Sequence, residues 1–325
     1  MKSLLLAAAA ALVLSAAAPA GELELVQTIN LKGKPGQLDH VAIDAKRDRL
    51  FLANKANNTL DIIDLKSGML VKQKTSQTGI QGIAYAPDLD KVFVGLGSGL
   101  FNVFDGDSYK IVKTLRFKDD ADNVRYVPST HMVYVAHAEK MLGVIDASTY
   151  SLKADIKLPD TAEGFEKETR RPRMYVNAPG ANLVAVIDTD KNEVVQTFPT
   201  TMATGGHPLA LDEASQRIYV GCHKKPMVLV LDTESGKEIT GADIAGGVDD
   251  MWLDAKRKRL FASCADGRLV VLKVVDADHV EPLESIETPK GARTCLYVPE
   301  TGRLYLAVPR QDGKDGPEIQ VYQVK

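Results

Sequence analysis

Short apolar segments alternate with polar turns along almost the whole chain, and the same arrangement recurs several times. Each unit holds an apolar strand, a turn, a second strand, a short polar loop and a third strand that ends in Asp, as in 49–70, 132–152, 173–194 and 217–238. Within the segments, Val, Ile, Leu and Tyr alternate with other residues at a period of two, which favours half-buried β-strands over helices. The sequence therefore predicts an all-β protein made of repeats.

The repeats have a regular length. The third strand of five successive units ends in an aspartate, and these residues are 41 to 44 positions apart: Asp64, Asp105, Asp146, Asp188 and Asp232. Lys273 takes the next place, 41 residues further on. A period of about 40–45 residues with four short strands is typical of a β-propeller blade. An aspartate before a polar turn accepts backbone N–H groups, so we interpret these five as structural rather than catalytic.

Seven segments fit the first strand of a unit, which predicts seven blades. They begin near His40, Gly82, Asn123, Gly164, Pro208, Asp250 and Thr294. The last unit stops after its third strand, 318–322, whereas 23–29 is similar to the fourth strand at 193–198. We therefore expect a seven-bladed β-propeller of four-stranded antiparallel blades, with the N-terminal strand completing the C-terminal blade, because closure removes open strand edges.

The first twenty residues have the features of a signal peptide. Lys2 precedes an apolar run over 4–14, and Ala18-Pro19-Ala20 fits a signal peptidase site. We expect cleavage after Ala20, a single propeller domain over 21–325, and a periplasmic or secreted protein. No later apolar run reaches about 18 residues, so no membrane insertion is expected.

Charge and motifs exclude several functions. The net charge is −3, and without a Lys/Arg stripe we expect no nucleic-acid binding. The sequence has no C-x-x-C-H, so covalent haem is excluded, and it has no G-x-S-x-G, Gly-rich phosphate loop or H-E-x-x-H. Three cysteines, Cys222, Cys264 and Cys295, are an odd number for an oxidising compartment, and we expect free thiols.

Two short sequences resemble a known family. Tyr-Val-Asn at 175–177 and Val-Ile-Asp-Thr at 186–189 are similar to YVTN-repeat β-propellers of the YncE-like group of exported bacterial proteins. The resemblance covers nearly all of 21–325 and implies the fold and export. Because YVTN-type propellers serve as binding modules, surface-layer components and enzyme subunits, it implies no single activity.

The mouth of the central channel is the expected site. In such a blade, the loop before the first strand and the loop between the second and third strands open on one face, where polar groups converge. The candidate ligand-binding residues are Asp39, His40, Asp122, Asn123, His137, Glu163, Asn177, His207, Cys222, Asp249, Asp250 and Arg293.

Four of these residues are candidate metal ligands: His40, Glu163, His207 and Asp249. Carboxylate oxygens suit hard divalent cations, and imidazole suits borderline ones. Acidic loop residues also cap strand ends and hydrate a channel, so a metal-free mouth stays open as an alternative.

We expect a monomeric binding or scaffold module that takes a small molecule, a metal ion or a protein partner at this acidic, His-containing mouth. One alternative is a metal-assisted hydrolase or lyase, lactonase-like, that uses Glu163, Asp249, Asn123 and His207. Another is a structural envelope protein with an inert mouth, because fold alone does not define function.

Overall fold

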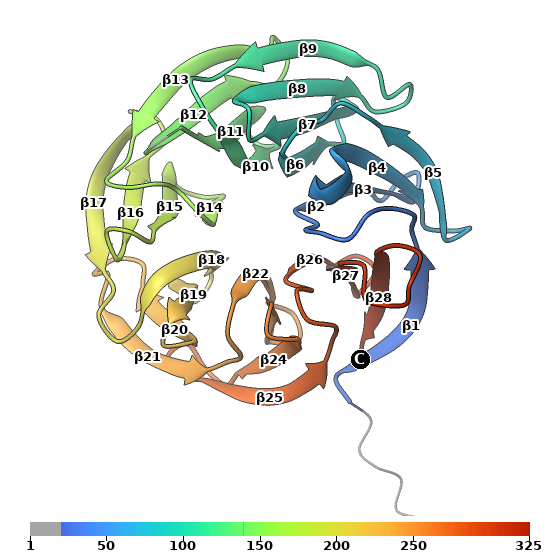
Figure 1. Ribbon diagram of the computed structural model, residues 1–325. Helices are drawn as coiled ribbons and strands as arrows, with labels where there is room; N and C mark the ends of the chain where they lie inside the picture. Colours follow the sequence, from blue (N-terminus) through green and yellow to red (C-terminus); the bar gives the residue numbers. More distant parts are fainter. Residues whose placement is uncertain (1–20, 139) are drawn as a thin grey trace, which may run out of the picture.

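The computed structural model describes residues 21–138 and 140–325. Over these ranges the chain forms seven antiparallel sheets of four strands each, arranged in a ring around a central channel (Figure 1). The predicted seven-bladed β-propeller is confirmed. The signal peptide predicted at 1–20 lies outside the described residues. In the described ranges, no helix has the length and apolar character needed to cross a membrane.

Blades 1 to 6 each take four consecutive strands, from the innermost to the outermost. Blade 1 also has a 3-10 turn, η1 (Lys55–Asn57), after its second strand. The strands of blades 1 to 3 are β2 (Val41–Asp44), β3 (Arg49–Asn54), β4 (Thr59–Asp64), β5 (Met69–Lys74), β6 (Ile80–Ala86), β7 (Lys91–Leu96), β8 (Leu100–Asp105), β9 (Ile111–Arg116), β10 (Ala121–Val127), β11 (Met132–His137), β12 (Met141–Asp146) and β13 (Ser151–Lys157). Those of blades 4 to 6 are β14 (Phe165–Lys167), β15 (Arg173–Ala178), β16 (Leu183–Asp188), β17 (Glu193–Pro199), β18 (Thr204–Asp212), β19 (Arg217–Lys224), β20 (Met227–Asp232), β21 (Glu238–Asp243), β22 (Val248–Asp254), β23 (Arg259–Cys264), β24 (Arg268–Val274) and β25 (Val280–Glu287).

Blade 7 joins the two ends of the described chain. It contains β26 (Thr294–Val298), β27 (Arg303–Val308), β28 (Glu318–Val324) and, as its outermost strand, β1 (Leu23–Asn30). β1 pairs antiparallel with β28, from Leu23 opposite Val324 to Asn30 opposite Glu318. The predicted closure by the N-terminal strand is confirmed.

Apolar side chains fill the seven interfaces between neighbouring blades. Each of seven hydrophobic clusters draws its residues mainly from two adjacent sheets. Ile29 of the closing strand is 1% exposed and lies in the cluster that also holds Leu50 of blade 1 and Ile319 of blade 7. The closing strand therefore helps to build the core between the first and last blades.

The aspartates that end the third strands make the predicted turns. In blade 1, the Ser67 backbone N–H donates to Asp64 Oδ1 at 2.7 Å, and in blade 5 the Ser235 N–H donates to Asp232 at 2.8 Å. The backbone N–H and the hydroxyl of Ser67 lower the pKa of Asp64 to about 2. These contacts support the structural interpretation of the repeated aspartates.

On the face opposite the mouth, here called the lower face, acidic residues at the end of first strands hold arginines that reach the next blade. Arg47 pairs with Asp44 of its own turn and donates to Asp90 (3.1 Å) and Tyr85 (3.0 Å) of blade 2. The same Asp-Ala-Lys-Arg sequence recurs at 254–257, where Arg257 contacts the Tyr297 hydroxyl of blade 7 at 3.3 Å. These ion pairs and hydrogen bonds link neighbouring blades at the inner rim.

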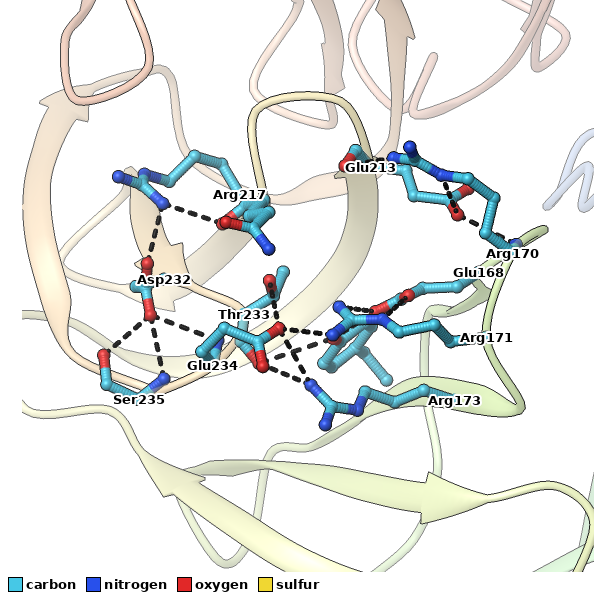
Figure 2. A network of polar contacts seen from close by, with 12 residues as sticks. Glu168, Arg170, Arg171, Arg173, Glu213, Arg217, Asp232, Thr233, Glu234 and Ser235 are labelled. Atoms are coloured by element: carbon cyan, nitrogen blue, oxygen red, sulfur yellow. Dashed lines mark hydrogen bonds and ion pairs between the residues drawn. The ribbon is translucent and has the colours of Figure 1, made fainter.

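Blade 4 has a related contact with blade 5 (Figure 2). Glu168 has a side chain that is 1% exposed, and it accepts hydrogen bonds from Arg171 (2.7 Å) and the Tyr175 hydroxyl (2.6 Å). Arg171 also pairs with Glu234 of blade 5 at 2.7 Å. A buried carboxylate is tolerated here because an arginine and a hydroxyl satisfy its oxygens.

Replacing Ile29 by alanine tests whether ring closure stabilises the fold. The substitution leaves a cavity between blades 7 and 1, so we expect the free energy of unfolding to fall by about 3 kcal/mol. Leu25 lies on the same strand but is 49% exposed, and Leu25→Ala should cost less than about 1 kcal/mol. Urea denaturation measures both values. Equal losses for the two variants would contradict a core role for β1.

Candidate functional site

The innermost strands β2, β6, β10, β14, β18, β22 and β26 surround the channel (Figure 1). Several predicted mouth residues lie within these strands rather than in the preceding loops. The pairing of the first two strands shifts register across 121–124, 206–209 and 248–250. A bulge turns side chains out of the regular alternation. These three irregularities contain Asp122, His207 and Asp249. The bulges therefore account for polar side chains at the start of these innermost strands.

Glycines allow the innermost strands to approach closely at the mouth. A Cβ atom on Gly82 would lie 1.8 Å from the carbonyl oxygen of Asp122, and one on Gly164 would lie 2.7 Å from that of His207. The Gly164 N–H donates to this His207 oxygen at 2.8 Å. The second contact crosses from blade 4 to blade 5 and brings Glu163 beside the His207 ring.

Three of the candidate residues form one group at the mouth. Asp39, His40 and Asp122 each offer a ligand atom, and the three atoms lie within 4.8 Å of one another. His40 Nε2 is 3.8 Å from Asp39 Oδ1, and its Nδ1 is 3.8 Å from Asp250 Oδ1. Asp250 also accepts the Cys295 backbone N–H at 2.9 Å, which fixes the carboxylate.

A second group surrounds His207. Its Nε2 atom lies 3.4 Å from Glu163 Oε2 and 3.7 Å from Asp249 Oδ1. The Nε atom of Arg293 is 3.3 Å from the other oxygen of Asp249. The His207 ring stacks on His223, with centroids 4.7 Å apart. The four candidate metal ligands are therefore divided, because His40 belongs to the first group and the other three belong to the second.

Burial and mutual repulsion raise the pKa of several mouth carboxyls. Burial and the nearby charges of Asp39 and Glu163 raise the pKa of Asp122 well above its ordinary value. Burial and the Asp249 charge raise the pKa of Glu163 to about 7, and the same two causes raise that of Asp250 to about 7. Burial raises the pKa of Asp39 as well, although Lys55 and Arg293 oppose it. The mouth carboxyls therefore retain protons near neutral pH.

The two histidines at the mouth are held in the neutral form. Burial, with help from the Arg125 charge, lowers the pKa of His40 to about 3. Burial also lowers the pKa of His207, and this outweighs the opposing charge of Asp249. A neutral imidazole keeps a lone pair on one ring nitrogen, which can accept a proton or bind a metal ion.

The structure brings most of the predicted residues to the mouth, and two others support them. Asp39, His40, Asp122, Glu163, His207, Asp249, Asp250 and Arg293 converge there. Asn177 donates from Nδ2 to the carbonyl oxygens of His207 and Pro208, both at 3.0 Å, and so holds the bulge. Asn123 is buried beside Asp122.

Two predicted residues lie elsewhere. His137 ends β11, stacks on Phe117 of blade 2 at 4.1 Å and contacts Asp155 of the outermost strand β13 at 2.6 Å. Cys222 is fully buried in the cluster between blades 4 and 5, and burial raises its pKa to about 12. The physical reason is the same for both: second strands are one strand removed from the channel, and these side chains point into the interface between blades.

The cysteines behave as expected. Cys222, Cys264 and Cys295 are all free and buried. Cys222 and Cys264 lie in second strands and Cys295 in the innermost strand of blade 7.

The sequence reasoning missed several channel residues. Lys55 of η1 lies 3.6 Å from Asp39. Deeper in the channel, a cavity of about 210 Å³ is lined by His40, Arg125, Asp250 and Trp252. Arg125 is a charged residue between Val124 and Tyr126 in a first strand, and this was the available signal. Lys55 begins the loop between the second and third strands of blade 1. Loops of this kind were expected to open at the mouth, so the sequence already indicated Lys55.

Comparisons with known proteins support the fold and do not identify a family. No protein-family model matches the chain, and no curated protein matches it. Among solved structures, hydrazine synthase from Kuenenia stuttgartiensis has a similar structure, with a TM-score of 0.78 over 90% of this chain and 96% of that chain. The two sequences are 15% identical, so the similarity concerns the fold alone.

Replacing Glu163 by glutamine tests the raised pKa of this buried carboxyl. The folded protein retains the Glu163 proton up to about pH 7, while the unfolded chain releases it near its ordinary value of 4.5. Wild-type stability therefore falls as the pH rises through this window, and a glutamine avoids the loss. Relative to wild type, Glu163→Gln should gain roughly 2–3 kcal/mol between pH 4.5 and pH 8.

Chemical denaturation at the two pH values measures this difference. Glu24→Gln, at an exposed position on β1, is the matched control and should show no pH-dependent gain. A Glu163→Gln variant that follows wild type at both pH values would refute the raised pKa of Glu163.

Proposed function

We propose that this protein is a binding module whose channel mouth takes a cation, and that a divalent metal ion is the ligand. The observation that carries the proposal is the group of Asp39, His40 and Asp122, whose ligand atoms lie within 4.8 Å of one another. Two carboxylates and a neutral imidazole are a donor set that suits divalent transition metals.

The electrostatics of the mouth support this proposal. Two like charges about 4 Å apart repel by about 4 kcal/mol at the effective dielectric of a protein surface. Burial and this repulsion together raise the pKa of Asp122, Glu163 and Asp250, and burial raises that of Asp39, so these carboxyls tend to hold protons. A bound divalent cation would replace those protons and stabilise the ionised carboxylates. Arg293 pairs with Asp249 of the second group.

The setting of this module follows from the predicted signal peptide. Cleavage after Ala20 would release a monomeric propeller into the periplasm or outside the cell. There it would bind its cation, alone or as part of a small molecule or a protein partner, through the ring of polar side chains at the mouth.

Calorimetric titration after dialysis against a chelator tests the cation site. At pH 7.5, Mn²⁺, Zn²⁺ or Ca²⁺ should bind with a stoichiometry of one, and binding should weaken at pH 5 because protons compete for the carboxylates. Asp122→Asn should weaken binding at least about tenfold. Asp243→Asn, on the outer strand β21, is the control and should bind normally. A protein whose titration and melting temperature ignore all three ions would overturn the proposal.

A second candidate function is a metal-assisted hydrolase or lyase that acts at the same mouth. The observation that favours it is the pair formed by Glu163 and His207, whose side chains are 3.4 Å apart. A carboxyl with a pKa of about 7 is suited to general acid or base catalysis. Asp249 Oδ1 lies 3.7 Å from the same imidazole.

A lactone-hydrolysis screen separates binding from catalysis. If the second function holds, the metal-loaded protein should hydrolyse lactones, and Glu163→Gln should reduce the rate by about 10²–10⁴-fold without loss of the bound ion. Binding of the ion with no turnover would support the binding module alone.

A further inference from the structure

The turn between the first and second strands of blade 4 differs from its six counterparts. In the other blades the residue before the second strand has a positive φ; these residues are Asp48, Asp90, His131, Gln216, Lys258 and Gly302. Blade 4 has Pro172 at this position. The proline ring fixes φ near −65°, so the usual tight turn cannot form. Consistent with this, β14 has three residues, fewer than any other first strand in the described ranges.

A crevice lies beside this turn, on the lower face between blades 3 and 4. Its volume is about 570 Å³, within the usual range for sites that hold a small organic molecule. Met132, Tyr134 and Val144 of blade 3 line its apolar part, together with Pro172. Tyr134 is 2% exposed, so the floor of the crevice is a fixed part of the core.

The polar part of the crevice is mostly cationic. Lys153, Lys167, Arg170 and Arg171 line it, and among the described residues Asp190 is the one carboxylate in the lining. Lys167 Nζ donates to the carbonyl oxygens of Glu168 (2.9 Å) and Arg171 (3.3 Å). Lys167 has no carboxylate partner within 4 Å in the described part of the chain.

The other cations differ in how far they are neutralised. Lys153 lies 4.0 Å from Asp146, at the limit of an ion pair, and its side chain is 53% exposed. Arg170 uses Nε for the Glu213 carboxylate and Nη2 for the Glu213 carbonyl oxygen, both at 3.1 Å, and it has a side chain that is 70% exposed. Both residues therefore have N–H groups available to an anion, whereas Arg171 is taken up by Glu168 and Glu234.

The turn that carries Arg170 and Arg171 is held in place by blade 5 (Figure 2). Glu213 accepts the backbone N–H groups of Thr169 and Arg170, both at 2.9 Å. Glu234 pairs with Arg171 and, at 3.1 Å, with Arg173. A turn fixed in this way loses little conformational entropy when a ligand binds, which favours affinity.

We propose that this crevice is a second binding site, which takes a small organic anion. The phosphate or carboxylate head contacts Lys153, Lys167 and Arg170, and the apolar body packs on Met132, Tyr134 and Val144. This site lies on the face opposite the mouth and does not depend on the cation proposed there.

Calorimetric titration with four probes tests the site: phenyl phosphate, benzoate, inorganic phosphate and the neutral benzyl alcohol. Phenyl phosphate or benzoate should bind saturably and more weakly as salt increases. Inorganic phosphate and benzyl alcohol should each bind at least about tenfold more weakly, because each lacks one half of the interaction. Binding of phenyl phosphate without benzoate would indicate a site for phosphate only, and binding of benzoate would indicate a site that accepts carboxylates.

Two lysine variants locate the binding. Lys153→Gln and Lys167→Gln should each weaken the preferred anion several-fold, and the double variant at least about tenfold. Lys113→Gln is the matched control, since Lys113 is the third residue of β9 as Lys153 is of β13. Lys167 also donates to two carbonyl groups of the turn, so the melting temperatures of the variants and the wild type are compared. If Lys167→Gln lowers the melting temperature, the test rests on Lys153→Gln alone. Absence of saturable binding by both aromatic anions, equal binding of benzyl alcohol, or unchanged affinity in Lys153→Gln and the double variant would overturn the proposal.

Discussion

The pairing of β1 with β28 is the constraint on which the rest of the structure depends. Each blade is a thin sheet with two faces, and both faces are buried only when a neighbour covers each of them. In an open array the outer faces of the first and last blades would be exposed. Closure instead gives Ile29 and Ile319 a common cluster with Leu50, and the ring fixes seven innermost strands around one channel.

The channel mouth is a consequence of this geometry with an electrostatic cost. Residues more than 200 positions apart, such as Asp39 and Asp250, both lie beside His40 because the ring brings the starts of the innermost strands together. Bulges and close-packed glycines give these strands room for polar side chains. The resulting burial and crowding of carboxylates raise their pKa values. The proposed cation would stabilise the ionised carboxylates. On the lower face, at the boundaries between blades 1 and 2 and between blades 4 and 5, arginines and carboxylates instead neutralise one another.

The sequence predicts the fold well because the repeat is a local pattern. A period of 41 to 44 residues and alternating apolar positions depend on short segments alone, and ring closure follows from one missing strand. The direction of a side chain at the edge of a blade depends on the neighbouring blade, which a single repeat does not contain. For this reason His137 and Cys222 were placed at the mouth, although they pack between blades. Arg125 was overlooked because it was treated as part of a first strand. Its side chain was not considered as a group that borders the channel.

The protein contains one tryptophan, and Trp252 lies in the lining of the channel cavity with its indole N–H bound to the Cys295 carbonyl oxygen at 2.8 Å. Its indole shares this cavity with His40 and Asp250. All tryptophan fluorescence of the intact protein therefore comes from Trp252 in the channel cavity. This tryptophan emission reports on hydration and charge inside the channel without any label. The outer surface of the ring contributes no tryptophan emission.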